Sequence, residues 1–80
     1  MHPKILLVDD DAELVAMLAQ YLRNEGVESL TAGDGAAALQ HLGENPPDLV
    51  VLDVMLPGRS GFDVLREIRA SLPRLPVIML

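Results

Sequence analysis

The chain has 80 residues, enough for one domain, and a domain this small buries only roughly 60% of the surface that its unfolded chain exposes. Its 6 basic and 12 acidic residues leave a net charge of -6, which disfavours binding to a nucleic-acid backbone. The absence of cysteine excludes disulfides and thiolate chemistry, and no apolar run approaches the roughly 18 residues of a membrane span, so we expect a cytoplasmic protein.

The first part of the chain predicts a strand, a helix and a second strand. The aliphatic run 4–9 (KILLVD) is typical of a strand, and apolar residues then recur at helical spacing over 10–25. We expect the buried stripe of this helix to consist of Leu14, Met17, Leu18, Tyr21 and Leu22. Gly26 stands where a left-handed helix cap is expected, and 27–32 indicates a weak second strand.

A short helix and a central strand are predicted next. The turn 33–35 (GDG) leads into an alanine-rich helix over 36–42, with Asp34 as its N-cap and Gly43 as its stop. Two prolines then break the chain before 48–53 (DLVVLD). This apolar run lacks alternation, which is typical of a strand buried on both faces.

The last part of the chain predicts a loop over 57–61, a third helix and a fourth strand over 76–80 (PVIML). We expect the apolar face of the third helix to consist of Phe62, Leu65 and Ile68. Because strands and helices alternate throughout, the predicted fold is α/β, with a doubly wound parallel sheet whose crossovers are right-handed.

Three aspartates follow strands whose carboxyl ends meet at one edge of this sheet. Asp9 and Asp10 end the first strand and Asp53 ends the third, so parallel pairing of neighbouring strands brings three carboxylates into one crevice. Their repulsion is relieved by sharing a proton or by binding a hard cation, and an oxygen-only set of ligands favours Mg²⁺ over Zn²⁺ or Cu²⁺. The sequence therefore predicts a magnesium site.

Two of these aspartates, Asp10 and Asp53, also have a purely structural interpretation. Either Asp10, which begins a capping-box pattern, or Asp11 is expected to cap the following helix. An aspartate at the end of a strand, such as Asp53, also occurs in proteins where it has no functional role. Two strands that both end in acid at the same edge of the sheet favour a functional site over that interpretation. We interpret His2 and His41 as solvated surface residues.

The sequence resembles receiver domains of response regulators in five segments that keep the family's order. These segments are 5–11 (ILLVDDD), 32–39 (AGDGAAAL), 47–57 (PDLVVLDVMLP), 61–65 (GFDVL) and 76–80 (PVIML). The phrase DVMLPG is most similar to the OmpR/PhoB-type transcription regulators. The resemblance implies a flavodoxin-like sheet with strand order 2-1-3-4, and implies that residues 1–80 form the first part of one receiver domain.

The resemblance also implies a function for the acidic residues. Asp53 would accept a phosphoryl group from a phosphohistidine of a sensor histidine kinase, with Mg²⁺ neutralising the charge that develops. Asp10 would ligate the cation directly, Asp9 through water and Met55 through its backbone carbonyl. The domain would act as a phosphoacceptor rather than as an enzyme, and would control an output domain, DNA-binding in this subfamily, outside this chain.

The loop after the acceptor and the end of the chain carry two further expectations. Pro57 is expected to shape that loop, with Gly58 and Gly61 giving it freedom to turn. Family members continue past Leu80 into a Ser or Thr and later a Lys that contact the phosphoryl oxygens, so we expect phosphorylation and its readout to be impaired in the 80-residue chain. The first helix would lie alone on its face of the sheet, and the apolar edge 77–80 would promote self-association.

Two other interpretations remain open. A truncated or engineered half-fold would assemble through its bare face and carry a chemically silent acidic pocket. A phosphotransfer enzyme of the haloacid dehalogenase type also places an aspartate after a strand, but it requires Asp-x-Asp, and Met55 stands where the second aspartate is needed. We therefore favour the receiver over either alternative.

Overall fold

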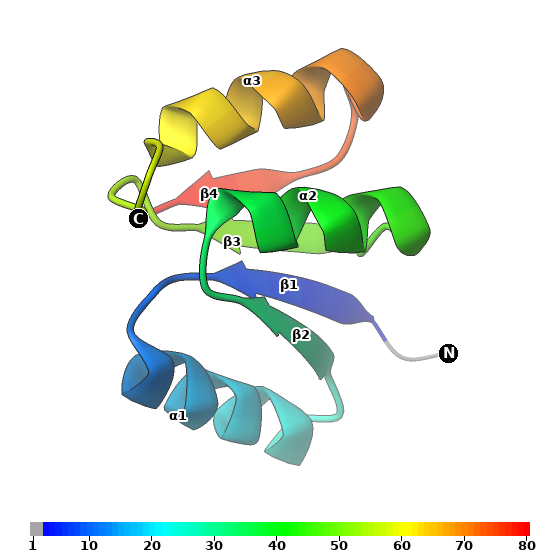
Figure 1. The fold of residues 1–80 in the computed structure, drawn as a ribbon. Helices are drawn as coiled ribbons and strands as arrows, with labels where there is room; N and C mark the ends of the chain where they lie inside the picture. The colour runs from blue at the N-terminus through cyan, green and yellow to red at the C-terminus, as the bar shows by residue number, and fades with distance from the viewer. Residues whose placement is uncertain (1–2) are drawn as a thin grey trace.

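The computed structural model describes residues 3–80, in which strands and helices alternate as predicted (Figure 1). The elements are β1 Lys4–Val8, α1 Ala12–Asn24, β2 Glu28–Ala32, α2 Gly35–Glu44, β3 Leu49–Leu52, α3 Gly61–Ser71 and β4 Val77–Met79. His2, interpreted from the sequence as a solvated residue, lies outside the described residues. Among residues 3–80, no helix has the length and apolar character needed to cross a membrane.

The described strands pair in parallel in the order β2-β1-β3-β4, which confirms the predicted order. In the register, Val8 at the end of β1 faces both Ala32 of β2 and Leu52 of β3. The carboxyl ends of the three strands therefore finish side by side. Helices α2 and α3 lie on one side of the sheet and α1 on the other (Figure 1).

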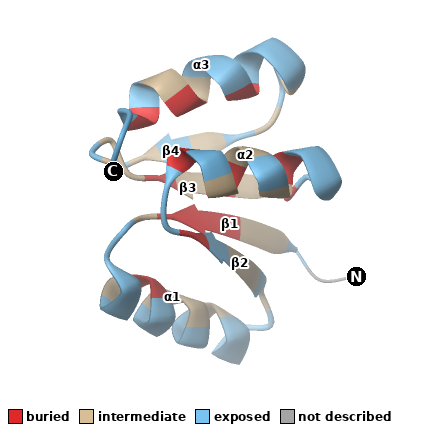
Figure 2. Cartoon of the chain, in the orientation of Figure 1, coloured by how far each residue is buried: buried red, intermediate tan, exposed pale blue. Residues whose placement is uncertain are grey.

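The main hydrophobic core lies between the sheet and helices α2 and α3. The central strands contribute alternate residues that are at most 1% exposed, namely Leu6, Val8, Val50 and Leu52. The two helices contribute Ala38, Leu42, Val64 and Ile68. Figure 2 shows these buried positions along β1 and at intervals on α2 and α3. Burying one such aliphatic side chain contributes roughly 1.5–3 kcal/mol, so this layer fixes the strand ends that carry the aspartates.

The opposite side of the sheet is more open over β3 and β4. Ile78 is 48% exposed and Leu80 is 64% exposed. The prediction that β3 is buried on both faces was therefore wrong, since its burial alternates, with Leu49 and Val51 only half-buried on this side. The physical reason is that α1 packs over β1 and β2, and on that side of the sheet no described helix covers β3 and β4.

The predicted apolar faces of two helices were partly wrong. Met17 and Tyr21 of α1 and Phe62 of α3 are all more than half exposed. The residue of α1 that is buried is Val15, and the buried residues of α3 are Gly61, Val64 and Ile68. Helical spacing allows neighbouring apolar stripes on one helix, and packing against the sheet decides which stripe becomes buried.

Capping residues and prolines set the helix bounds. The Asp34 side chain accepts a hydrogen bond from the Ala37 N–H at 2.8 Å, which confirms the predicted N-cap of α2. Gly26 has a φ of 79°, which confirms the left-handed position after α1. Gly43 was wrongly predicted to end α2, which continues to Glu44, because a glycine is tolerated inside a helix and the two prolines after Asn45 are not.

Candidate functional site

Three carboxylates meet where β1 and β3 end. Asp9 and Asp10 follow β1 directly and Asp53 follows β3, and the residues before Asp9 and Asp53 are register partners. One carboxylate oxygen of each aspartate lies within 4.8 Å of the corresponding oxygens of the other two. The structure thus brings together the three acids that the sequence placed at one edge of the sheet.

Backbone hydrogen bonds hold two of these carboxylates in place. The Asp53 N–H donates to the Val8 carbonyl at 2.9 Å, which ties the end of β3 to the end of β1. The Oδ1 atom of Asp53 accepts from the Met55 N–H at 3.1 Å, and the Oδ1 atom of Asp9 accepts from the Asp11 N–H at 2.9 Å. A carboxylate has about four acceptor positions, so each retains capacity for another ligand.

The structure separates the roles of neighbouring aspartates in the run 9–11. Asp11 is the N-cap of α1, since its Oδ1 atom accepts from the Leu14 N–H at 3.1 Å. Asp10, the alternative cap considered from the sequence, is exposed and belongs to the carboxylate cluster. The carboxylate that caps α1 is therefore not one of the three in the cluster, and Asp10 remains available as a metal ligand.

The composition and spacing of the cluster fit a small hard cation. Opposite ligands of an octahedral Mg²⁺, with bonds of about 2.1 Å, lie about 4.2 Å apart, which is close to the spread of these oxygens. Asp10 is exposed and Asp9 and Asp53 are half-buried, so water can complete the coordination shell. A hollow of about 240 Å³ beside Asp9 and Asp10 leads to the same edge of the sheet. The all-oxygen donor set suits Mg²⁺ better than a softer metal.

Removing one of the three charges is expected to stabilise the metal-free chain. With EDTA present, Asp10→Asn should raise the free energy of unfolding by roughly 1 kcal/mol, because it relieves repulsion between carboxylates whose oxygens lie within 4.8 Å of one another. The same variant should lose most of the stabilisation that Mg²⁺ gives to the wild type, since a bound ligand stabilises only the folded state. Urea denaturation with EDTA and with MgCl₂ measures both effects.

Asp63→Asn is the matched control for that experiment, because Asp63 lies on α3 outside the cluster and pairs with Arg66. It should show neither the gain in EDTA nor the loss of the Mg²⁺ effect. An Asp10→Asn chain that is less stable than the wild type in EDTA, and that Mg²⁺ stabilises normally, would contradict a shared cation site.

The two glycines of the loop after Asp53 act in different ways. Gly58 has a φ of 81°, as expected of a glycine that allows a turn. Gly61 does not have a positive φ, so the prediction that it gives the loop freedom to turn was wrong. A Cβ at Gly61 would overlap the carbonyl oxygen of Asp53 and lie 2.9 Å from the Cα of Val54. Its role is to let the start of α3 pack directly on the backbone of Asp53.

The same loop is closed at its base by backbone pairing. Met55 and Ser60 form an isolated antiparallel bridge, and the Gly61 N–H donates to the Val54 carbonyl at 2.7 Å. The side chain of Ser60 also accepts from the Asp63 N–H and caps α3. These contacts hold Met55 beside Asp53, whereas the use of the Met55 carbonyl as a metal ligand stays a prediction.

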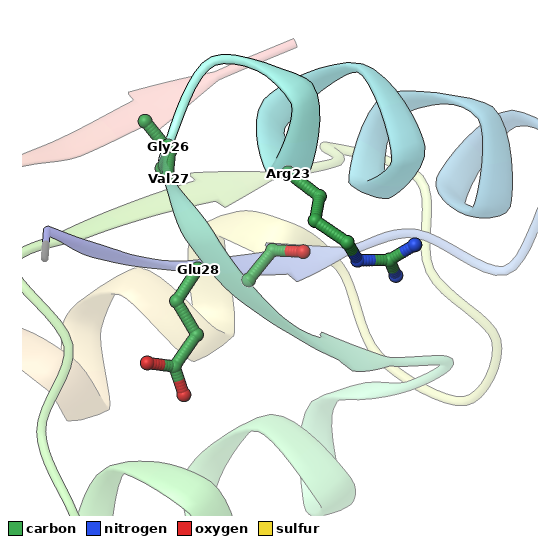
Figure 3. A pocket seen from close by; sticks show the side chains of 5 residues that line it. Arg23, Gly26, Val27 and Glu28 are labelled. Atoms are coloured by element: carbon green, nitrogen blue, oxygen red, sulfur yellow. The ribbon is translucent and has the colours of Figure 1, made fainter.

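A second hollow, of about 280 Å³, lies at the other end of α1 and is lined by Arg23, Gly26, Val27, Glu28 and Ser29. Because α1 has 13 residues, this hollow is about 20 Å along the helix from Asp10. Arg23 and Glu28 extend in different directions (Figure 3). Their charges do not converge on one ligand, so we assign no function to this hollow.

The family model of the response regulator receiver domain matches residues 5–80. The chain belongs to this family. The receiver is 50% identical over 80 residues to the DNA-binding response regulator MtrA of Mycobacterium tuberculosis (strain H37Rv). It is 41% identical over 80 residues to the alkaline phosphatase synthesis transcriptional regulatory protein PhoP of Bacillus subtilis. Both alignments cover 100% of this chain but only 35% and 33% of those proteins, so the receiver spans about a third of their length.

Solved receiver structures have the same fold. The chemotaxis response regulator CheY4 of Vibrio cholerae matches with a TM-score of 0.95 at 30% identity, covering 99% of this chain and 68% of that chain. NtrX of Brucella abortus matches with a TM-score of 0.91 at 40% identity, covering 99% of this chain and 18% of that chain. MtrA and PhoP are OmpR/PhoB-type regulators, as the sequence predicted, and receivers are a signalling rather than a catalytic family. The haloacid dehalogenase alternative was therefore wrong.

Proposed function

We propose that this receiver accepts a phosphoryl group on Asp53 from the phosphohistidine of a sensor histidine kinase, with Mg²⁺ as cofactor. The observation that carries this proposal is the meeting of Asp53 with Asp9 and Asp10, whose oxygens lie within 4.8 Å of one another at the strand ends. Ligands in open parallel sheets bind at this edge, next to the point where the strand order reverses. An acid fixed beside two others at that place is suited to receive a phosphoryl group together with a cation.

The proposed transfer uses one carboxylate oxygen of Asp53. Because Oδ1 accepts a hydrogen bond from the Met55 N–H, we assign the attack on phosphorus to Oδ2. As the new O–P bond forms, the P–N bond to the kinase histidine breaks, and the imidazole keeps its electron pair and takes a proton from solvent. A Mg²⁺ held by Asp9, Asp10 and the Met55 carbonyl would neutralise charge on the phosphoryl oxygens and the carboxylate. The product on Asp53 is an acyl phosphate.

The proposed partners follow from the relatives and from the charge of the chain. MtrA is named a DNA-binding response regulator, and the receiver covers 35% of its length. We therefore propose that phosphorylation of this receiver controls a DNA-binding output domain. A net charge of -6 disfavours direct DNA binding by the receiver itself. An output that acts on the chromosome requires a cytoplasmic location.

Acetyl phosphate tests the proposed chemistry without a kinase. Incubation with acetyl phosphate and Mg²⁺ should add a single phosphoryl group per chain by intact mass, and EDTA should prevent the addition. Hydroxylamine should remove the group, as it does from an acyl phosphate. We expect slow labelling of the 80-residue chain. A chain that binds Mg²⁺ but takes up no label would favour the chemically silent half-fold over the phosphoacceptor.

We also propose that the 80-residue chain self-associates through the open side of β3 and β4. Ile78 and Leu80 are exposed there, and β4 forms an edge of the described sheet, with backbone groups available for pairing. Light scattering should give a mass that rises from monomer toward dimer with concentration. Ile78→Lys should hold the chain monomeric, whereas Phe62→Lys, at a similarly exposed apolar position on α3, should not. A monomer mass at every concentration would contradict the proposal.

A further inference from the structure

The loop between Asp53 and α3 contacts two helices through Arg59. The guanidinium of Arg59 forms an ion pair with the carboxylate of Glu67, in the second turn of α3. Both side chains are partly exposed, so solvent screens the pair and its charge alone holds the loop weakly. Arg59 also makes a contact through its aliphatic stem.

That stem lies against the first turn of α2. A Cβ placed at Gly35 would lie 2.9 Å from the Cδ of Arg59, 3.2 Å from its Cγ and 2.8 Å from the Cγ2 of Val64. Gly35 is buried and is the first residue of α2. The methylene groups of Arg59 thus occupy the space in which a side chain at position 35 would stand. The missing Cβ of Gly35 lets Arg59 cross from the loop, past α2, to α3.

The contacts of Arg59 lie next to the base of the loop, because Arg59 directly precedes Ser60. Backbone pairing between Met55 and Ser60 closes the base, and the chain then turns through Gly58, whose φ is 81°. Residues 34–36 and 57–59 together line a hollow of about 410 Å³. Loss of the Arg59 stem would give the loop room to move into that hollow. Arg59 therefore adds a contact with α2 beside the β-bridge, where the loop leads into α3.

We propose that Arg59 is a positioning residue, whose stem on Gly35 and ion pair with Glu67 order the loop that presents the Met55 carbonyl to the cation. This inference rests on the proposed use of that carbonyl as a ligand. If the loop is already ordered before the cation binds, cation binding does not have to be accompanied by a further loss of loop conformational entropy. The same contacts link the cation site to the first turn of α2, so the amide of Gly35 should respond when the site fills.

Measurements of Mg²⁺ affinity distinguish this positioning role from a role in stability alone. Titration calorimetry of the 80-residue chain should show that Arg59→Ala weakens Mg²⁺ binding about two- to fivefold, the range expected for losing a partly exposed pair and its packing. Stability in urea with EDTA should change little. Arg59→Met keeps the stem without the charge and should recover part of the affinity. In the wild type the amide resonance of Gly35 should shift on addition of Mg²⁺, and in Arg59→Ala that shift should shrink.

Arg66→Ala is the matched control, because Arg66 pairs with Asp63 on the outer side of α3 and should leave Mg²⁺ binding unchanged. An Arg59→Ala chain that binds Mg²⁺ as tightly as the wild type or the control overturns the inference, and the proposed phosphoacceptor role then still stands. A wild type that binds Mg²⁺ in an Arg59-dependent way but takes up no phosphoryl group overturns the proposed function alone. A wild type that binds no Mg²⁺ overturns both.

Discussion

Asp53→Asn is expected to abolish acetyl phosphate labelling, because a neutral amide does not attack phosphorus and forms no acyl phosphate. The substitution should leave the fold intact, since an amide oxygen can still accept the hydrogen bond that Oδ1 now receives from the Met55 N–H. Intact mass after incubation with acetyl phosphate and Mg²⁺ measures the loss. The expected result is a chain that remains folded and takes up no phosphoryl group.

Other acidic residues provide the comparison for this experiment. Asp63→Asn lies outside the cluster and should be labelled like the wild type. Asp10→Asn should be labelled more slowly, because it keeps the acceptor but loses a proposed metal ligand. Labelling of Asp53→Asn at the wild-type rate would place the acceptor on another carboxylate and would overturn the assignment of Asp53.

Gly61→Ala is expected to have the largest effect on stability among glycine substitutions near the site. The new Cβ would overlap the Asp53 carbonyl oxygen and lie 2.9 Å from the Cα of Val54, so the backbone of the acceptor or the start of α3 must move. Forcing an extra carbon into a packed position costs about 1–3 kcal/mol, a large share of a stability of about 5–15 kcal/mol. Urea denaturation should show this loss. Mg²⁺ affinity should fall as well, because Asp53 is displaced.

Gly43→Ala tests whether a clash causes that loss. Gly43 lies in the last turn of α2, and a Cβ there would meet nothing within 4 Å. Alanine is favoured over glycine inside a helix, so this substitution should stabilise the chain by about 0.5–1 kcal/mol. The two glycine-to-alanine changes thus have opposite expected signs. A Gly61→Ala chain as stable as Gly43→Ala would show that the loop adjusts freely around position 61.

Local patterns predicted most of the elements of this receiver. The aliphatic runs before Asp9 and Asp53 became the neighbouring strands β1 and β3. A chain in which strands and helices alternate forms a parallel sheet, because each helix carries the chain back to the start of the next strand. Asp34 and Gly26 took their predicted capping positions, since each acts on backbone within a few residues of itself. The meeting of Asp9, Asp10 and Asp53 followed from the same reasoning, because it requires only the direction and order of the strands.

Predictions that depended on packing were less successful. Spacing along the chain made Phe62 and Met17 candidates for burial, yet both are more than half exposed, because the angle at which a helix meets the sheet selects the buried stripe. The sequence also left open whether Asp10 or Asp11 caps α1. The structure decides for Asp11, whose carboxylate lies within hydrogen-bonding distance of the Leu14 N–H.

The sequence by itself determined that three carboxylates lie at one edge of a parallel sheet, because strand direction and topology follow from short-range patterns. Only the tertiary structure decided how the loop after Asp53 is held. Gly61 is needed where α3 packs on the Asp53 backbone, and Gly35 is needed where Arg59 crosses α2 to reach Glu67. These contacts join residues from different elements at van der Waals distance, and the spacing of residues along a chain carries no information about such distances.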